Sequence, residues 1–204
     1  MRYERGRKDA TRRRIMEIAS DRFRSDGIAA SGLAGIMSDA GLTNGAFYPH
    51  FRSKAELVRE SLAKAIDDQS SLIGKVIADA GIEGAIDAYL SPQHRDNPGT
   101  GCTLAALLPE IAREPAETRN VYAERFLAIS HEIASALPQH TDDPEGAAIA
   151  VYATLVGTLQ LARAVAGTPL SDRIMAAGSA AARTLAGKRP PQDEMKVGPG
   201  SGPG

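Results

Sequence analysis

The segment at residues 41–57, GLTNGAFYPHFRSKAEL, decides the fold of the N-terminal part of the chain. It places Phe47 and Phe51 four positions apart, which is the spacing of neighbours on one face of a helix. It also contains SKAE at 53–56, the pattern of a capping box that opens a helix. The segment therefore predicts a short helix over residues 44–50, followed by a long helix after the capping box.

Two further helices are predicted upstream of this segment. Residues 9–26 carry apolar side chains at the spacing of one helical face, and Gly27 stands where a glycine ends a helix. Ser31 is a candidate N-cap for a second short helix that Gly41 ends. Three helices with a glycine-containing turn between the second and the third form a helix-turn-helix.

The rest of the chain shows helical signals and no sustained strand alternation, so we predict an all-α fold. Further helices are expected over residues 54–80, 82–91, 102–113, 115–137, 144–167 and 171–187. The stretch 91–101 is rich in Pro, Gly and Asn and is predicted to be a loop. The predicted organisation is a three-helix domain over 8–68, a helical body over 69–187 and a disordered tail over 188–204, where four prolines and four glycines fall in 17 residues.

Bulk composition excludes several classes of protein. The 204 residues contain no run of eighteen apolar residues, so no membrane span is expected, and the polar N-terminus does not read as a secretory signal. The single cysteine excludes an internal disulfide and a multi-cysteine zinc site. No spacing of histidines and acids suits a metal, and no cofactor is expected. These features predict a cytoplasmic protein.

Charge is distributed unevenly along the chain. Residues 1–60 hold twelve Lys and Arg against eight Asp and Glu, whereas residues 61–204 hold twelve against seventeen. A basic end on an acidic body suggests an anionic partner that meets one end only. A solvated charged face is the alternative that charge alone leaves open.

One face of the predicted third helix carries residues that do not suit a buried core. If Phe47 and Phe51 point inward, Asn44, Gly45 and Tyr48 lie on the opposite face. A glycine there costs about 1 kcal/mol of helix propensity relative to alanine, and a closely approaching partner surface would explain it. This face therefore suggests a contact surface.

The chemistry of this face suits DNA. The N-terminus of the second helix of a helix-turn-helix enters the major groove, and its N–H groups suit phosphate. Asn44 can pair with the N6/N7 edge of adenine. The hydroxyls of Thr43 and Tyr48 and the ammonium of Lys54 can reach phosphates.

The run TRRRIMEIASDRFRSDGIAASGLAGIMSDAGLTNGAFYPHFRSKAELV at residues 11–58 resembles the DNA-binding domain of TetR-family transcriptional regulators. The resemblance implies a dimeric regulator, most often a repressor, that is released from a palindromic double-stranded DNA operator by a small-molecule effector. By the family's pattern, Thr43, Tyr48, His50 and Lys54 contact the DNA backbone, and Asn44 and Gly45 lie near the bases. Ser31 completes the set of candidate DNA contacts.

Two residues depart from the family's pattern. Gly32 lies in the expected first turn of the second helix, where a better helix former is more common. Pro49 lacks the N–H that would bond the carbonyl of Gly45, and it biases Tyr48 away from α geometry. The recognition helix is therefore expected to be short or to end in a distorted turn.

The resemblance also implies that the body binds an effector and forms the homodimer. Residues 144–167 and 172–187 are rich in Ala and Gly, which allows close helix approach, and such regulators build a four-helix interface from this part of the chain. An intramolecular core is the alternative. The candidate effector contacts are Cys102, Tyr122, Phe126 and Tyr152.

Cys102 has a second interpretation, because it precedes a predicted helix and a helix N-terminus favours a reactive thiol. A regulator that senses electrophiles or oxidants through this residue, and a regulator that needs no ligand, both remain alternatives. An enzyme is not expected. A thiol–imidazole pair of Cys102 with His94, His131 or His140 would be its only support, and no fixed spacing favours one.

Overall fold

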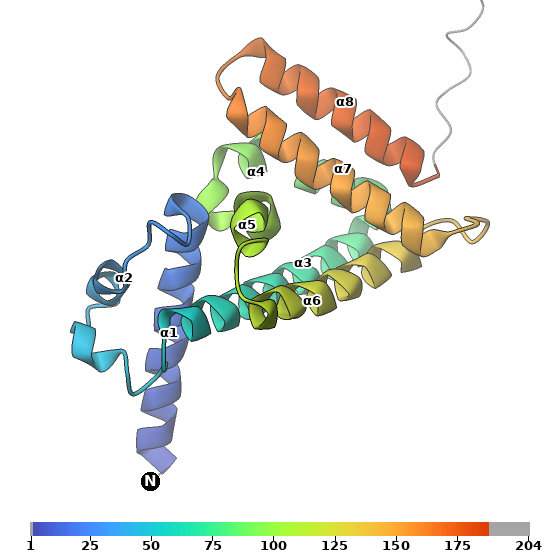
Figure 1. Cartoon of the computed structure of the whole chain (residues 1–204). Coiled ribbons are helices and arrows are strands. Elements are labelled where there is room, and N and C mark those ends of the chain that lie inside the picture. The colour runs from blue at the N-terminus through green and yellow to red at the C-terminus, as the bar shows by residue number, and fades with distance from the viewer. Residues whose placement is uncertain (1, 188–204) are drawn as a thin grey trace, which may run out of the picture.

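The computed structural model describes residues 2–187, with side chains from Gly6 onward, and the predicted tail lies outside these residues. The described chain is entirely helical, which confirms the predicted class (Figure 1). Its elements are α1 (Arg2–Asp26), α2 (Leu33–Asp39), the 3-10 helix η1 (Asn44–Ala46), α3 (Lys54–Tyr89), α4 (Pro92–Asp96), the 3-10 helix η2 (Pro98–Thr100), α5 (Thr103–Ile111), α6 (Ala116–Ser135), α7 (Pro144–Ala164) and α8 (Pro169–Leu185).

The N-terminal elements enclose a small apolar core of their own. Ile15 and Phe23 of α1, Ile36 of α2, and the predicted pair Phe47 and Phe51 are each no more than 2% exposed. The rings of Phe47 and Phe51 stack with their centroids 5.5 Å apart. The predicted inward face of residues 44–51 is therefore confirmed.

The capping box at the start of α3 is also confirmed. The Ser53 hydroxyl accepts from the backbone N–H of Glu56 at 3.1 Å. The Glu56 carboxylate accepts in return from the backbone N–H of Arg52 at 2.7 Å. Two N–H groups that have no partner within the helix are thereby satisfied, which fixes where α3 begins.

Three predicted boundaries are wrong. The first helix begins at Arg2, well before residue 9, since the polar run ahead of the apolar pattern continues the helix. The N-cap of α2 is Gly32, not Ser31, and it makes no side-chain cap. The stretch 91–101, predicted to be a loop, contains α4 and η2, because Ser91 accepts from the N–H of His94 and starts a helical turn ahead of the glycines.

The third element is shorter than a regular helix, as the proline in it suggested. Only Asn44–Ala46 form a 3-10 helix, and a turn follows in which the N–H groups of His50 and Phe51 both bond the Phe47 carbonyl. Pro49 has no N–H with which to continue the helical pattern back to Gly45. The chain therefore leaves helical geometry soon after the exposed residues.

Two pairs of long helices form the body (Figure 1): α3 with α6, and α7 with α8. Gly81 has φ of +66° and kinks α3, so the predicted helices 54–80 and 82–91 form one bent element. α7 and α8 approach very closely, because a Cβ at Gly178 would lie 2.1 Å from the Thr158 hydroxyl oxygen. The small residues predicted to allow close helix approach do so within the chain.

Within the described residues, α7 is the one helix whose length and composition would allow it to cross a membrane. Its 18-residue window has a mean hydropathy of 1.3, and 44% of that window is buried inside the chain. Val151, Tyr152, Leu155 and Leu159 of this helix are almost fully buried. A core helix of a helical domain meets the same criteria.

Candidate DNA-binding surface and effector cavity

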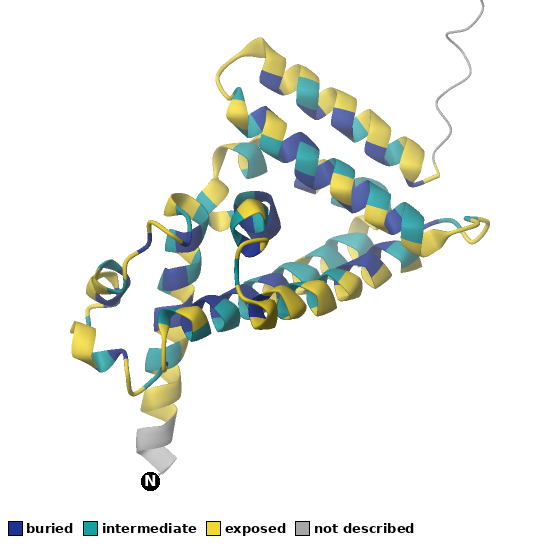
Figure 2. Ribbon diagram, viewed as in Figure 1, coloured by how far each residue is buried: buried dark blue, intermediate teal, exposed yellow. Residues whose placement is uncertain are grey.

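An exposed polar surface lies on the buried core of the N-terminal domain. Thr43, Asn44, Gly45 and Tyr48 are all exposed, and Tyr48 is 68% exposed beside the fully buried Phe47. Figure 2 shows that much of the segment between α2 and α3 is exposed. The hydroxyl of Thr43 makes no cap hydrogen bond although Thr43 is the N-cap of η1. Four of the seven predicted DNA contacts therefore form one accessible group, which we call the η1 surface.

Gly45 adds a second observation on the η1 surface. A Cβ built on Gly45 would meet no atom within 4 Å, and its φ is not in the left-handed region. The protein's own packing and backbone therefore do not require glycine here, although glycine weakens a helix. A partner that approaches the backbone closely would require it.

The other three predicted contacts have partners or surroundings inside the domain. The Ser31 side chain is fully buried and donates to the Gly27 carbonyl at 2.7 Å. The Lys54 ammonium donates to the Ile28 carbonyl at 2.6 Å. His50 is half-buried, and its Nδ1 is buried without a hydrogen-bond partner among the described residues. Ser31 is therefore closed to an outside partner, whereas Lys54 and His50 are half-buried and Lys54 keeps two further N–H donors, so both stay predicted contacts beside the η1 surface.

α1 adds positive charge next to this region. Arg7, Lys8, Arg13 and Arg14 are exposed on α1. Arg12 instead points inward, with its guanidinium 4.5 Å above the Phe51 ring and paired with Glu60. The basic end predicted from the sequence is therefore largely accessible to an anionic partner.

The four predicted effector contacts meet in one aromatic cluster in the body. The Tyr122 and Phe126 rings lie 5.8 Å apart, and the Phe126 and Tyr152 rings 5.9 Å apart. The Cys102 sulfur lies 3.6 Å from the Tyr152 hydroxyl. Tyr152 and Cys102 are each 2% exposed, whereas Tyr122 and Phe126 are half-buried, so the cluster is closed on its Cys102–Tyr152 side.

An open crevice lies beside this cluster, and sequence reasoning missed its main residues. Its volume is about 730 Å³, and its wall includes Cys102 but none of the three predicted aromatic residues. Tyr89 connects the two, because its ring lies 6.1 Å from Tyr152 and also lines the crevice. Tyr89 stands between Ala88 and Leu90 near the end of a predicted helix, and nothing local marked it as a lining residue.

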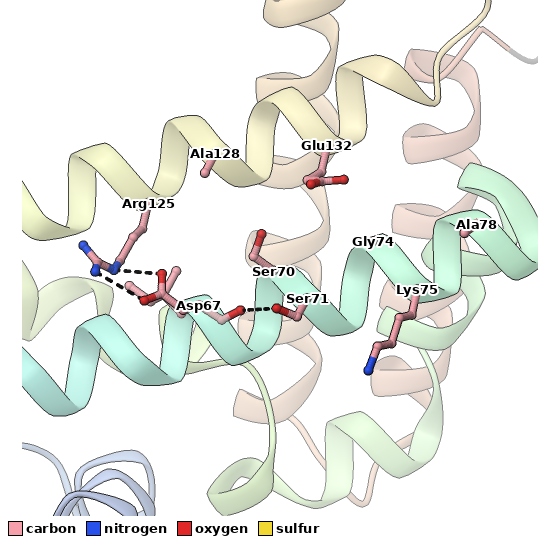
Figure 3. Close-up of a pocket in the computed structure, with 10 residues that line it drawn as sticks. Asp67, Ser70, Ser71, Gly74, Lys75, Ala78, Arg125, Ala128 and Glu132 are labelled. Atoms are coloured by element: carbon pink, nitrogen blue, oxygen red, sulfur yellow. Dashed lines mark hydrogen bonds and ion pairs between the residues drawn. The ribbon is translucent and has the colours of Figure 1, made fainter. Parts of the chain in front are cut away.

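A second hollow of about 570 Å³ lies between α3 and α6 (Figure 3). Two contacts tie part of its wall together: Arg125 pairs with Asp67 at 3.0 Å, and Ser71 donates to the Asp67 carbonyl at 2.9 Å. Ser70, Lys75 and Glu132 also line it, and Gly74, Ala78 and Ala128 leave it space. This hollow is therefore polar and lies apart from the predicted effector contacts.

His94 joins the end of α3 to the start of α5. Its Nδ1 donates to the Tyr89 carbonyl at 2.7 Å, and its Nε2 accepts from the backbone N–H of Cys102 at 2.8 Å. This pair of bonds requires the neutral ring. The thiol of Cys102 bonds to Tyr152 and to the backbone N–H of Ala105 instead, so the thiol–imidazole pair of the enzyme alternative is not formed with His94.

We expect stability to fall when the pH drops below about 6.5. Burial lowers the pKa of His94 from the ordinary value of 6.5 despite its bond to Tyr89, and burial followed by the charges of Lys8 and Arg12 lowers the pKa of His50. The unfolded chain then takes up protons first, so stability present above pH 6.5 is lost below it. Thermal melts at pH 7.5, 6.5 and 5.5 should show this fall, and His94→Gln should show a shallower one. Equal pH slopes for the two proteins would contradict this account of His94.

The fold and the η1 surface define a helix-turn-helix protein with a helical body, and comparisons with known proteins agree. Residues 15–61 match the profile of bacterial regulatory proteins of the tetR family. Two regulators of Pseudomonas putida, the transcriptional regulator TtgR and the probable regulator ArpR, are each 48% identical to this chain over 52 residues. These matches cover 26% of this chain and 25% of each relative.

Whole-chain similarity comes from solved structures and shows the fold. A TetR-family regulator from Cytophaga hutchinsonii has a TM-score of 0.74 at 18% identity, over 90% of this chain and 98% of that one. Reduced NemR from E. coli has a TM-score of 0.72 at 18% identity, over 86% and 96%. These relatives are transcriptional regulators, not enzymes. Residues 15–61 therefore carry a tetR-family DNA-binding domain, and the whole chain has the fold of solved TetR-family structures.

Proposed function

We propose that the protein is a homodimeric repressor that binds a palindromic operator through the η1 surface and is released by a small-molecule effector. The observation that carries this proposal is the η1 surface itself. Its hydroxyl, amide and phenol groups are exposed directly above the rigid Phe47–Phe51 core, and its glycine has no role in the chain's own packing. Preorganised polar groups at the start of a recognition element suit DNA.

Helices α7 and α8 support the dimer. Each carries an apolar stripe that the chain does not bury completely: Ile149, Ala153, Gly157 and Leu161 on α7, and Leu170, Ile174, Ala177, Ala181 and Leu185 on α8. Leu161 is 61% exposed and Leu170 is 48% exposed. A two-fold contact that covers these stripes would present two η1 surfaces to successive major grooves of a palindrome.

The route from effector to DNA is a population shift. An effector that binds better to a conformation in which the two η1 surfaces no longer match successive grooves will lower operator affinity. Glu110 of α5 supports such coupling, because its carboxylate accepts from the N–H of Ala29, between α1 and α2, at 3.0 Å. A movement of α5 in the body would act on the helix-turn-helix through this bond.

The alternative in which Cys102 senses electrophiles stays a prediction. The sulfur is at the N-cap of α5, as predicted, and it accepts from the N–H of Ala105 at 3.4 Å. The residue is only 2% exposed, so a reagent would have to displace part of the crevice wall to reach it. The thiol is also already bonded to Tyr152 and to the N–H of Ala105, and we therefore propose a non-covalent effector.

We expect Asn44→Ala to relax the choice of DNA sequence at one position of each half-site. A bidentate contact to adenine contributes about 1–3 kcal/mol of discrimination, so the variant should bind the preferred and the substituted operator with similar affinity. Thr43→Val is the matched variant: it should weaken binding to all sequences alike, by roughly tenfold, because it removes a bond to phosphate. Gel shifts on a set of single-base operator variants measure both effects. Unchanged sequence preference in Asn44→Ala would show that this residue does not read bases.

A further inference from the structure

The crevice beside the aromatic cluster lies between the two parts of the chain. One wall is a face of α1, the second is the middle of α3, and the third runs from the last turns of α3 to the start of α5. Figure 1 shows the C-terminal end of α1 next to the α4–η2 segment, and Arg24 of α1 donates to the Gly99 carbonyl of η2 at 2.5 Å. A volume of about 730 Å³ is that of a small-molecule site.

Two residues that line the crevice each carry a buried polar atom with no partner of regular hydrogen-bond geometry among the described residues. They are Gln69, through its amide oxygen Oε1, and Tyr89, through its hydroxyl, which lies near the Cys102 thiol without a well-aligned bond to it. Tyr89 is 7% exposed, and its hydroxyl is protonated at neutral pH and can donate; burial, followed by the neighbouring Cys102 and Tyr152, raises its pKa further. Buried polar groups are normally hydrogen-bonded, so two such atoms in one wall call for an explanation. A ligand with a matching polar group supplies one.

The rest of the wall indicates what else this ligand contains. Leu72, Ile73, Val76 and Ala88 give the α3 wall an apolar surface. The charged residues of the wall largely neutralise one another, because Arg24 pairs with Asp21 at 2.5 Å and Lys64 pairs with Asp68 at 2.7 Å. Glu17 is exposed in the wall, and its carboxylate would repel an anion. The wall therefore favours an uncharged molecule.

We propose that this crevice binds a neutral, largely apolar molecule with a hydroxyl group, which donates to Gln69 Oε1, accepts from the Tyr89 hydroxyl, or does both. The proposal deepens the proposed function, on which its regulatory consequence rests. A molecule in this site contacts α1 and the body at once. It will shift the protein away from any conformation in which α1 and η2 close the crevice.

The test uses 2-naphthol, a neutral aromatic alcohol, and isothermal titration calorimetry on the full chain at pH 7.5 without DNA. We expect the parent to bind 2-naphthol, and Tyr89→Phe and Gln69→Leu each to bind at least fivefold more weakly. Ala88→Phe, which fills the crevice, should abolish binding. 2-Naphthoate, which has the same ring system and a charge, should bind the parent at least tenfold more weakly than 2-naphthol.

Tyr122→Phe is the control, because Tyr122 belongs to the aromatic cluster but not to the crevice wall. It should bind 2-naphthol like the parent. Thermal melts separate ligand binding from a structural role, because loss of a stabilising hydroxyl would lower the melting temperature. Tyr89→Phe should melt at the same temperature as the parent or higher, since it removes an unsatisfied buried group. A lower melting temperature together with unchanged 2-naphthol affinity would overturn the proposal.

Failure to bind 2-naphthol, or equal binding by the parent, Tyr89→Phe and Gln69→Leu, would also overturn the proposed site. Neither result depends on DNA. A protein that binds 2-naphthol as expected but recognises no operator would overturn the proposed function and leave the site intact. A protein that binds an operator but not 2-naphthol would overturn the proposed site and leave the proposed function intact.

Discussion

Leu161→Glu is expected to convert the protein to a monomer and to lower operator affinity by at least about a hundredfold. Leu161 is 61% exposed in the apolar stripe of α7. In a two-fold interface the substitution places a carboxylate from each copy against apolar surface, where an unpaired charge is costly. Without the dimer each half-site is bound independently, and the gain from linked binding, about 10²–10⁴-fold, is lost.

Light scattering coupled to size-exclusion chromatography measures the mass of the variant, and gel shifts measure its operator affinity. Leu127→Glu is the matched control, because Leu127 is 46% exposed on α6, outside both stripes. It should remain dimeric and bind the operator like the parent. A Leu161→Glu protein that stays dimeric would show that the interface lies elsewhere.

Phe47→Ala is expected to lower the free energy of unfolding of the N-terminal domain by about 3–5 kcal/mol and to abolish operator binding. The Phe47 side chain is fully buried, and its ring contacts both Phe51 and Tyr48 with centroid distances of 5.5 Å. Its removal leaves a cavity directly beneath the η1 surface. That loss is large compared with the usual stability of a small domain.

Tyr48→Ala separates stability from contact at the neighbouring position. Tyr48 is 68% exposed, so its truncation should change the free energy of unfolding by at most about 0.5 kcal/mol while operator binding weakens. Urea denaturation followed by circular dichroism, together with gel shifts, compares the two variants. The account is contradicted if Phe47→Ala unfolds like the parent, or if Tyr48→Ala binds the operator like the parent.

Local sequence patterns predicted several features of the N-terminal part of the chain. The Phe47–Phe51 spacing and the capping box at residues 53–56 depend on interactions within one or two turns, and both appear in the structure. The effect of Pro49 is also local, because it follows from one missing N–H. The all-α class was predictable for the same reason.

Contacts between residues far apart in the sequence determine the features that local sequence patterns did not predict. The bond from the Lys54 ammonium to the Ile28 carbonyl, 26 positions away in the chain, was not predictable, although the predicted phosphate contact of Lys54 remains a prediction. Ser31 was expected at the surface and is buried by the packing of its neighbours. Tyr89 and Gln69 line one crevice only because α3 bends at Gly81 and α1 packs across it. The periodicity of apolar residues within a single helix does not predict which distant residues line the same crevice.

In the proposed function a dimer reads DNA through the η1 surface. Bound fragments can be selected from sheared genomic DNA, and the recovered fragment footprinted with the parent and with Asn44→Ala. We expect recovery of a fragment with an inverted repeat, protected by the parent on both half-sites and bound by Asn44→Ala with relaxed preference. Recovery of no preferred sequence, or an identical footprint and preference for both proteins, would contradict the proposed function.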